Sequence, residues 1–295
     1  MPRLNEIKDQ QVVVQTVGDF ANSLQQIAAA RMVKLRRTNL ASRRFVEEAT
    51  LILRELHLER LQQWEKDLAR GRLAKKRRRL TSSSTQTAIF VITSNQGLCG
   101  SYNNEIFDRV DQCLKEFPQA DYYVLGRKGQ NYFNHLKLKR PINYYPYPLS
   151  EAVSLAELQP LIGMFFYYQQ IYLIYSHYLN TATRQVVFVE LAVPHLGEIE
   201  AEKIKTEGKY LFEPSIDELI DQVSERIRYA LFRQQILDSR LSLYTAQMVA
   251  MKTASDNAGT LLTDLKLAYN KARRKLVDKK ISEVQAGRSL WETND

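Results

Sequence analysis

Hydrophobic residues recur every three to four positions through the last third of the chain. Alternating steps of four and three residues from Ile216 reach Ile216, Ile220, Val223, Ile227, Ala230, Gln234, Leu237, Leu241, Tyr244, Met248, Met251, Ser255, Ala258, Leu262, Leu265, Tyr269, Ala272 and Leu276. Only Gln234 and Ser255 among them are plainly polar. A 3.5-residue repeat of this length predicts a coiled-coil seam rather than an ordinary surface helix. Since Pro214 and Ser215 mark a plausible start, we expect one helix of about 75 residues, roughly 110 Å long.

A second long helix is predicted near the N-terminus. Residues 19–70 contain neither glycine nor proline and are rich in strong helix formers. Apolar residues recur there at Leu24, Ala28, Met32, Leu35, Val46, Ala49, Leu53 and Leu56. We expect the start of this helix, before Gly18, to be less regular. Two long helices at opposite ends of one chain pair most simply in antiparallel fashion, and alanines on both seams would permit close approach of the backbones.

The middle of the chain alternates between short apolar runs and amphipathic segments. Strands are predicted at residues 87–93, 122–126, 171–175 and 185–191, and helices at 103–117, 130–136 and 155–168. This alternation favours a doubly wound, mostly parallel sheet. The predicted fold class is therefore α/β: a long antiparallel coiled coil of residues 1–80 and 213–295, with an inserted α/β globular domain at 81–212.

Charge is distributed unevenly along the 295 residues. Residues 1–80 hold 18 Lys and Arg against 9 Asp and Glu, and so carry the whole formal net charge of +9. The densest run, residues 75–79, would suit an anionic partner such as nucleic acid, lipid headgroups or an acidic protein surface. The interpretation we favour is a solvated loop after a helix.

Cysteine and hydropathy counts exclude several classes of protein. The two cysteines, Cys99 and Cys113, are too few for a disulfide framework and form no metal-binding spacing. No apolar run approaches the roughly 20 residues of a membrane-spanning helix. The N-terminus shows no signal peptide pattern, and a reducing compartment is the natural expectation.

The turn Gly97-Leu98-Cys99-Gly100, between a predicted strand and a helix, is the sharpest local motif. Such a turn could present backbone N–H groups to a phosphate. It lacks the remaining residues of a P-loop or a dinucleotide fingerprint, so a structural turn is favoured over a phosphate site, and over a Cys99 nucleophile.

Other chemistry-bearing residues carry no recognisable motif. The histidines are scattered, the carboxylates form no acid/base pair, and the aromatic run at 165–168 is better explained as buried core than as a nucleotide-stacking surface. Met248 and Met251 lie on the seam and are expected to pack there. We therefore predict no catalytic residues, no cofactor and no metal.

Several motifs in collinear order resemble the gamma subunit of rotary F-type ATP synthases. Residues 94–100 are similar to that family's S-[DN]-x-G-L-C-G segment, and residues 210–214 to its Y-x-x-E-P entry to the long helix. Further similar segments are residues 27–32, 126–129, 248–252, 255–259 and 267–273. The resemblance covers nearly the whole chain.

The resemblance implies a non-catalytic central-stalk subunit, present once per complex. Its paired helices would transmit torque between the membrane c-ring and a catalytic ring of alpha and beta subunits, and its globular domain would contact an epsilon-type subunit. It implies a peripheral location at the cytoplasmic face of the bacterial plasma membrane, without nucleic-acid binding. Shaft-to-ring contacts are expected at Met32, Gln247, Met248, Met251, Lys252, Asp256, Asn257, Asn270 and Arg273.

Departures from the family pattern leave alternatives open. Gly18 stands within a helical segment, and the family's Glu and Arg in the motif before Met248 are absent. One alternative is the shaft of a specialised F-type-like ATPase that is not coupled to ion transport. A third class, motivated by residues 75–79, is a nucleic-acid-binding coiled-coil protein, and an independent enzyme is the weakest alternative.

Overall fold

The computed structural model describes residues 4–69, 86–136, 138, 141–147, 153–181, 183–192 and 215–292. The chain divides into two compact units. We call residues 1–29 with 247–295 the paired-helix unit, and residues 30–246 the mixed unit. The basic run 75–79, the linker at 81–85 and the motif at 210–214 lie outside the described residues.

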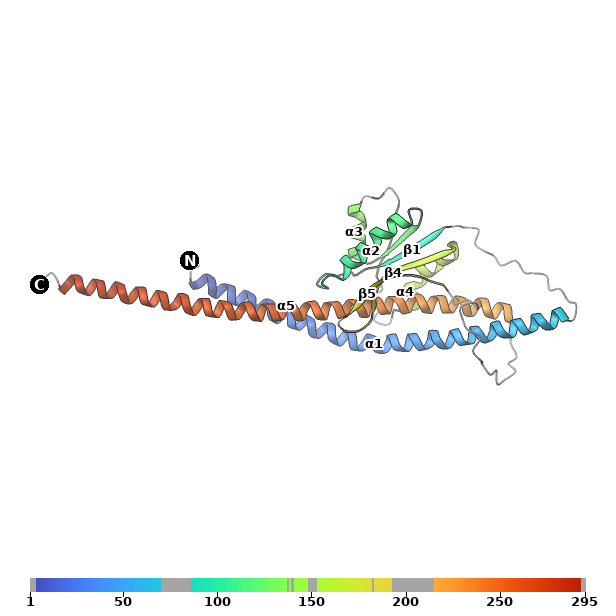
Figure 1. Ribbon diagram of the computed structural model, residues 1–295, viewed down its shortest axis with the longest axis horizontal. Helices are drawn as coiled ribbons and strands as arrows, with labels where there is room; N and C mark the ends of the chain where they lie inside the picture. Colours follow the sequence, from blue (N-terminus) through green and yellow to red (C-terminus); the bar gives the residue numbers. More distant parts are fainter. Residues whose placement is uncertain are drawn as a thin grey trace. The chain divides into compact units, whose positions relative to one another are not determined.

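Two long helices dominate the secondary structure (Figure 1): α1 spans Leu4–Ala69 and α5 spans Ile216–Glu292. The start and length of α5 agree with the prediction, and the Ser215 hydroxyl accepts a hydrogen bond from the Glu218 amide at 3.3 Å. The expectation of a looser start before Gly18 was wrong, because α1 is helical on both sides of that residue.

Within the paired-helix unit the two helices contact each other in antiparallel order. Gln11 Nε2 donates a hydrogen bond to the Leu265 carbonyl oxygen at 3.0 Å. A Cβ built on Gly18 would lie 3.2 Å from the Ala258 Cβ. As the residue number increases along α1, the residue number of its contact on α5 decreases. This is the order expected for an antiparallel pair.

Within the mixed unit, α1 and α5 also meet through apolar side chains. Leu53 and Leu56 of α1 form one buried cluster with Ile216, Ile220 and Ile227 of α5. An ion pair between Arg60 and Asp217, at 3.6 Å, lies beside this cluster. These contacts are antiparallel in order as well.

The mixed unit contains one five-stranded sheet among its described residues, in the order β3-β2-β1-β4-β5. The strands are β1 (Thr87–Ile92), β2 (Asp121–Leu125), β3 (Asn143–Tyr145), β4 (Gln170–Tyr178) and β5 (Arg184–Glu190). The first four pair in parallel, and β5 pairs antiparallel with β4. All four predicted strands are present and the mostly parallel sheet is confirmed, while β3 was missed.

Helices cover both faces of this sheet. On one face, α2 (Tyr102–Glu116) and α3 (Arg127–Leu136) pack against β1 and β2, with Ile106 and Phe133 buried against Ile89. On the other face lie α4 (Leu155–Ile162), the 3₁₀ helix η1 (Gly163–Tyr167) and α5, with Phe232 against Phe90. Alternate β1 residues therefore enter two different cores, which explains why β1 reads as a continuous apolar run.

The helix predicted at 155–168 is divided. The α-helix ends at Ile162, and Gly163 begins the 3₁₀ turn. The expectation of a buried aromatic run there was correct for Phe165, which is 2% exposed, and wrong for Tyr167, which is 66% exposed.

Candidate interaction surfaces

The seam of the paired-helix unit includes several small residues. Ala21 and Ala28 of α1 are buried, and Gly18 lies at close approach to Ala258. On α5 the predicted seam positions from Met248 to Ala272 are buried or half-buried, whereas Leu276 is 44% exposed.

The residues predicted to contact a surrounding ring fall into two groups. Met248 and Met251 lie on the seam of the paired-helix unit, where Met251 is 8% exposed, and Gln247 is half-buried. In the mixed unit, Met32 is half-buried and its sulfur accepts a hydrogen bond from the Thr245 hydroxyl at 3.4 Å. These four side chains thus pack mainly inside their own units.

The remaining predicted contact residues point to solvent. They are Lys252, Asp256, Asn257, Asn270 and Arg273, all exposed on α5. Lys252 Nζ and Asp256 Oδ1 form an ion pair at 2.9 Å. This second group is available to a partner.

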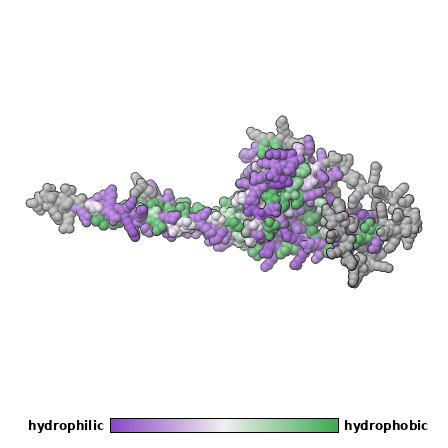
Figure 2. Space-filling model, in the orientation of Figure 1, coloured by the Kyte–Doolittle hydropathy of each residue, from purple (hydrophilic) through white to green (hydrophobic). Residues whose placement is uncertain are grey.

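Exposed apolar stripes on the same helices were missed by the sequence analysis. On α1, Val13, Val17, Phe20 and Ile27 are 48–61% exposed and fall on one face of the helix. On α5, Val277, Ile281 and Val284 form a similar face, with Val284 72% exposed. Figure 2 shows hydrophobic residues among hydrophilic ones along these helices. Exposed apolar faces of this kind mark interaction surfaces. In the sequence, these residues recur at helical spacing but outside the seam positions, and this pattern could have predicted the stripes.

In the mixed unit the predicted turn lies at the carboxyl edge of the sheet. Leu98 and Gly100 have positive φ angles of 62° and 58°, and the Leu98 side chain is 59% exposed, whereas Cys99 is 3% exposed. Asn103 accepts a hydrogen bond from the Ser94 amide at 3.1 Å and donates one to Cys99 Sγ at 3.3 Å. Gly97 lies close to the Lys128 side chain.

The neighbouring turn after β2 explains the glycines at 126 and 129. Gly126 has a φ of +102°, and a Cβ there would lie 2.5 Å from the Thr93 carbonyl oxygen. A Cβ on Gly129 would lie 2.6 Å from Val124 Cγ1. The Gly129 amide donates to Thr93 Oγ1 at 2.9 Å, and the Lys128 amide donates to the Ser94 carbonyl oxygen at 3.0 Å. The two turns therefore support each other by packing and hydrogen bonds.

These contacts support the structural interpretation of the turn at 97–100. Burial raises the pKa of the Cys99 thiol, which is the opposite of the shift that activates a cysteine nucleophile. Within the described ranges no group of three or more His, Cys, Asp or Glu could hold a metal ion. None of the described helices combines the length and hydropathy needed to cross a membrane.

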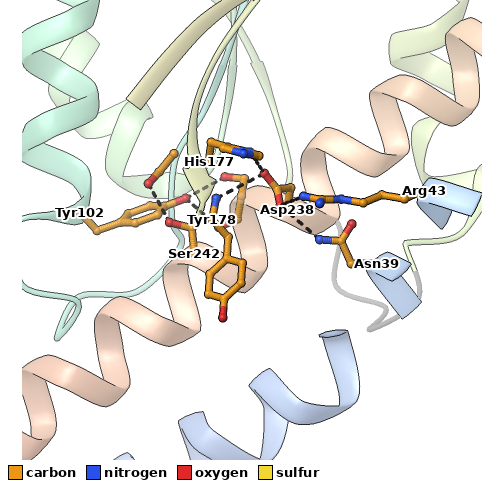
Figure 3. Close-up of polar contacts among 9 residues, drawn as sticks. Asn39, Arg43, Tyr102, His177, Tyr178, Asp238 and Ser242 are labelled. Atoms are coloured by element: carbon orange, nitrogen blue, oxygen red, sulfur yellow. Dashed lines mark hydrogen bonds and ion pairs between the residues drawn. The ribbon is translucent and has the colours of Figure 1, made fainter. Parts of the chain in front are cut away.

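A buried polar cluster was also missed. Asp238 of α5 is 3% exposed and contacts His177 of β4, together with Asn39 and Arg43 of α1 (Figure 3). His177, one of the scattered histidines, is therefore part of a polar cluster that no local sequence motif marks. No sequence signal pointed to this cluster, because its members come from three segments 60 to 199 residues apart.

Comparison with known sequences supports the resemblance. The chain matches the family model described as ATP synthase over residues 3–289. The ATP synthase gamma chain of Enterococcus hirae is 28% identical over 302 residues, which cover 98% of this chain and 99% of the relative. That of a Polaromonas species is 30% identical over 223 residues, covering 70% of this chain and 75% of the relative.

Solved structures share the fold. The match to the rotor of the Euglena gracilis mitochondrial ATP synthase has a TM-score of 0.59 at 15% identity, and covers 92% of this chain and 98% of that one. The match to the central stalk and c-ring assembly of the Tetrahymena thermophila mitochondrial ATP synthase has a TM-score of 0.55 at 18% identity, with 80% and 99% coverage. With the family match spanning almost every residue, this chain belongs to the ATP synthase family, among relatives that are gamma chains.

Proposed function

We propose that this chain is the central-stalk rotor subunit of an F-type ATP synthase. It transmits torque between a membrane ion-driven c-ring and a catalytic ring of alpha and beta subunits, and so couples ion transport to ATP synthesis or hydrolysis. The observation that carries the proposal is the antiparallel order of contacts between α1 and α5, in a chain that matches the family over residues 3–289.

The paired helices are suited to act as a coiled-coil shaft. Their seam follows a 3.5-residue repeat and brings the small residues Gly18 and Ala258 into close contact. The exposed apolar stripes at Val13, Val17 and Phe20 and at Ile281 and Val284 offer faces for a surrounding ring. An asymmetric shaft turning inside such a ring biases the conformational equilibrium of each catalytic subunit in turn.

The remaining assignments follow from the same proposal. Exposed Lys252, Asp256, Asn257, Asn270 and Arg273 serve as polar contacts to the alpha and beta subunits. The mixed unit contacts an epsilon-type subunit and the c-ring. In the turn at Gly97, Leu98, Cys99 and Gly100, the exposed Leu98 and Gly100 belong to its outer surface, while Cys99 is buried beneath them. The subunit is non-catalytic, is present once per complex, and lies peripherally at the cytoplasmic face of a bacterial plasma membrane.

The uncoupled alternative has less support. It was motivated by polar residues lost from the family pattern, whereas the curated relatives reported above are all ATP synthase gamma chains. The nucleic-acid alternative depended on residues 75–79, which lie outside the described residues.

Direct observation of rotation tests the proposal. The complex would be purified through a tag on this chain, fixed by its alpha/beta ring, and given a bead on the mixed unit. We expect ATP to drive rotation of the bead in one direction, and membrane vesicles to acidify or to accumulate sodium on ATP addition. ATP hydrolysis by the purified complex without rotation of this chain would contradict the assignment.

A further inference from the structure

A group of polar residues lies within the mostly apolar contact of α5 with the sheet. Asp238 is 3% exposed, and its Oδ1 accepts hydrogen bonds from Asn39 Nδ2 and Arg43 Nη2, both at 3.2 Å. Both donors come from α1. One carboxylate oxygen therefore joins the two long helices inside the mixed unit.

The other oxygen of the same carboxylate faces the sheet. Asp238 Oδ2 shares a hydrogen bond with His177 Nδ1 and accepts one from the Tyr178 amide at 3.4 Å (Figure 3). We call Asn39, Arg43, His177, Tyr178 and Asp238 the Asp238 cluster. Through a single side chain it links α1, α5 and β4.

Two neighbouring hydrogen bonds extend this polar contact along α5. Ser242 and Ser176 of β4 join through their hydroxyl oxygens at 2.7 Å, and both residues are fully buried. Ser239 Oγ and the Tyr102 hydroxyl of α2 are 2.8 Å apart. Positions 238, 239 and 242 fall on adjacent faces of one helical turn, so this turn is attached to β4 and to α2.

The packing of α5 against the sheet does not by itself require these polar residues. Phe232, Leu237 and Leu241 already bury α5 against the sheet, and hydrophobic contact is non-directional. A buried carboxylate carries a desolvation cost, and well-packed apolar residues often stabilise such a site equally well. Hydrogen bonds, in contrast, depend steeply on distance and angle, so they fix how far a helix can slide or turn against its neighbour.

We propose that Asp238 is a positioning residue that fixes the rotation and axial position of α5 against β4 and α1, so that torque passes between the helices and the sheet without slip. This inference rests on the proposed rotor function. It assigns to the Asp238 cluster the coupling between helices and globular domain within the mixed unit, and it leaves ATP chemistry to the ring.

The test is Asp238→Asn in the complete complex. Asparagine keeps the volume, but it replaces one acceptor oxygen by an NH₂ group that faces donors on β4 or α1, and it removes the charge opposite Arg43. We expect the complex to assemble and to hydrolyse ATP, while ions transported per ATP hydrolysed fall by a larger factor than hydrolysis does. Asp238→Asn with transport per ATP equal to the unmodified complex would overturn the proposal.

Asp217→Asn is the matched control. It neutralises the same residue type on the same helix and removes another ion pair between α5 and α1, but one in which Asp217 is 65% exposed. Transport per ATP should be unchanged in this variant. An equal loss in both variants would show that any weakening of the helix pair lowers coupling, and would also overturn a special role for Asp238.

A reversible covalent link separates positioning from folding. The Ser176 and Ser242 hydroxyl oxygens are 2.7 Å apart, so cysteines at both positions come within reach of a disulfide. The chain's own Cys99 and Cys113 are buried. In the Asp238→Asn background, oxidation of Ser176→Cys/Ser242→Cys should restore transport per ATP, and reductant should remove it again. Failure of the oxidised link to restore coupling would count against the proposal.

A milder variant decides the matter if Asp238→Asn does not assemble. Asn39→Ala removes the hydrogen bond from α1 to Asp238 Oδ1 and leaves the carboxylate in place, so it should still lower transport per ATP, while an unchanged ratio counts against the proposal. The two levels of inference remain distinct. An unmodified complex that hydrolyses ATP without moving ions refutes the rotor function, whereas a coupled unmodified complex with an equally coupled Asp238→Asn variant refutes only the role of Asp238.

Discussion

The same two helices, α1 and α5, have different surroundings in the two units. In the paired-helix unit the described residues of α1 contact α5 along one seam, and few side chains are buried, among them Ile7, Ala21, Ala28 and Met251. In the mixed unit a long stretch of α5, from Ile236 to Leu243, is buried on every face, and it contacts the sheet as well as α1.

The two units therefore differ in how much of their helix surface is exposed and how much is buried. The paired-helix unit exposes Val17, Phe20 and Val284, so these apolar side chains face solvent. The mixed unit places aromatic and polar side chains of α5, including Phe232 and Asp238, inside a core. Substitutions should therefore change stability strongly in the mixed unit, and should change assembly more than stability in the paired-helix unit.

The largest effect is expected for Phe232→Ala. Phe232 is fully buried, and its ring makes edge contacts with Phe165 at 5.1 Å and with Phe90 at 5.6 Å between centroids. Truncation removes these contacts and leaves a cavity, at a cost of about 3–5 kcal/mol in the free energy of unfolding. Urea unfolding followed by circular dichroism measures the loss.

Leu267→Ala is the control for that comparison. Leu267 lies on α5 in the paired-helix unit and is 65% exposed, so its truncation should change the free energy of unfolding by no more than about 0.5 kcal/mol. Equal losses in the two variants would show that the units do not differ as described.

Leu262→Pro should be nearly as severe although the residue is only half-buried. Proline removes the backbone N–H at 262 and its ring clashes with the carbonyl of residue 258, at a cost of about 3 kcal/mol or more. We expect loss of helical ellipticity, new proteolytic cleavage within α5, and dissociation or uncoupling of the assembled complex.

Leu262→Ala separates the seam from the helix. It keeps the backbone hydrogen bond and removes only seam contacts, so it should be milder than the proline variant. If the complex tolerates Leu262→Pro with full coupling, a continuous α5 is not required at this position.

The elements with long periodic patterns were predictable from the sequence. The 3.5-residue repeat on α5 and the apolar runs of β1, β2, β4 and β5 gave the helices, most of the sheet and its parallel character. The strand β3 was missed because Asn143–Tyr145 is three residues long, too short to establish a period. The end of α4 was missed because η1 continues with similar apolar composition.

The start of α1 differs from the prediction because the helix propensity of Gly18 does not decide where the helix begins. Glycine inside a helix costs about 1 kcal/mol relative to alanine. Here the absent side chain permits the close approach to Ala258, where a Cβ would lie 3.2 Å from its neighbour. Tertiary packing, which one helix's sequence does not show, explains the residue.

Gly18→Leu tests this explanation and should have an intermediate effect. The added side chain cannot fit at the Ala258 contact without displacing α5, so we expect destabilisation of about 1–3 kcal/mol by overpacking. Thermal unfolding of the full chain measures it. Gly18→Ala should be much closer to neutral, because its gain in helix propensity opposes a tight contact.

A double-mutant cycle tests whether residues 18 and 258 contact each other directly. Ala258→Gly opens space opposite residue 18, so it should recover part of the loss caused by Gly18→Leu, although it costs helix propensity alone. Strictly additive effects would contradict a direct contact between these two positions.

Clusters of buried polar residues are a second feature that could not be predicted from the sequence. Asp238 stands in a helix beside Ser239 and Arg240, where a carboxylate is normally expected to face solvent. Its partners Asn39 and Arg43 are 199 and 195 residues away, and His177 is on a strand. Only the pairing of α1 with α5 and of α5 with the sheet brings these groups together.

The smallest effect on stability, and the sharpest contrast with the mixed unit, is expected for Asp256→Asn. Asp256 pairs with Lys252 one turn away at 2.9 Å, with both side chains about 60% exposed. An exposed pair of this kind contributes only about 0.3–0.5 kcal/mol, so the melting temperature of the free chain should hardly change. If Asp256 is a contact to the catalytic ring, the affinity of the ring for this variant should nevertheless fall. Titration of the alpha/beta ring with each variant of this chain measures that affinity. Asp217→Asn, an exposed residue of the mixed unit, is the control. Equal affinities of the ring for the two variants would show that Asp256 is not part of the contact surface.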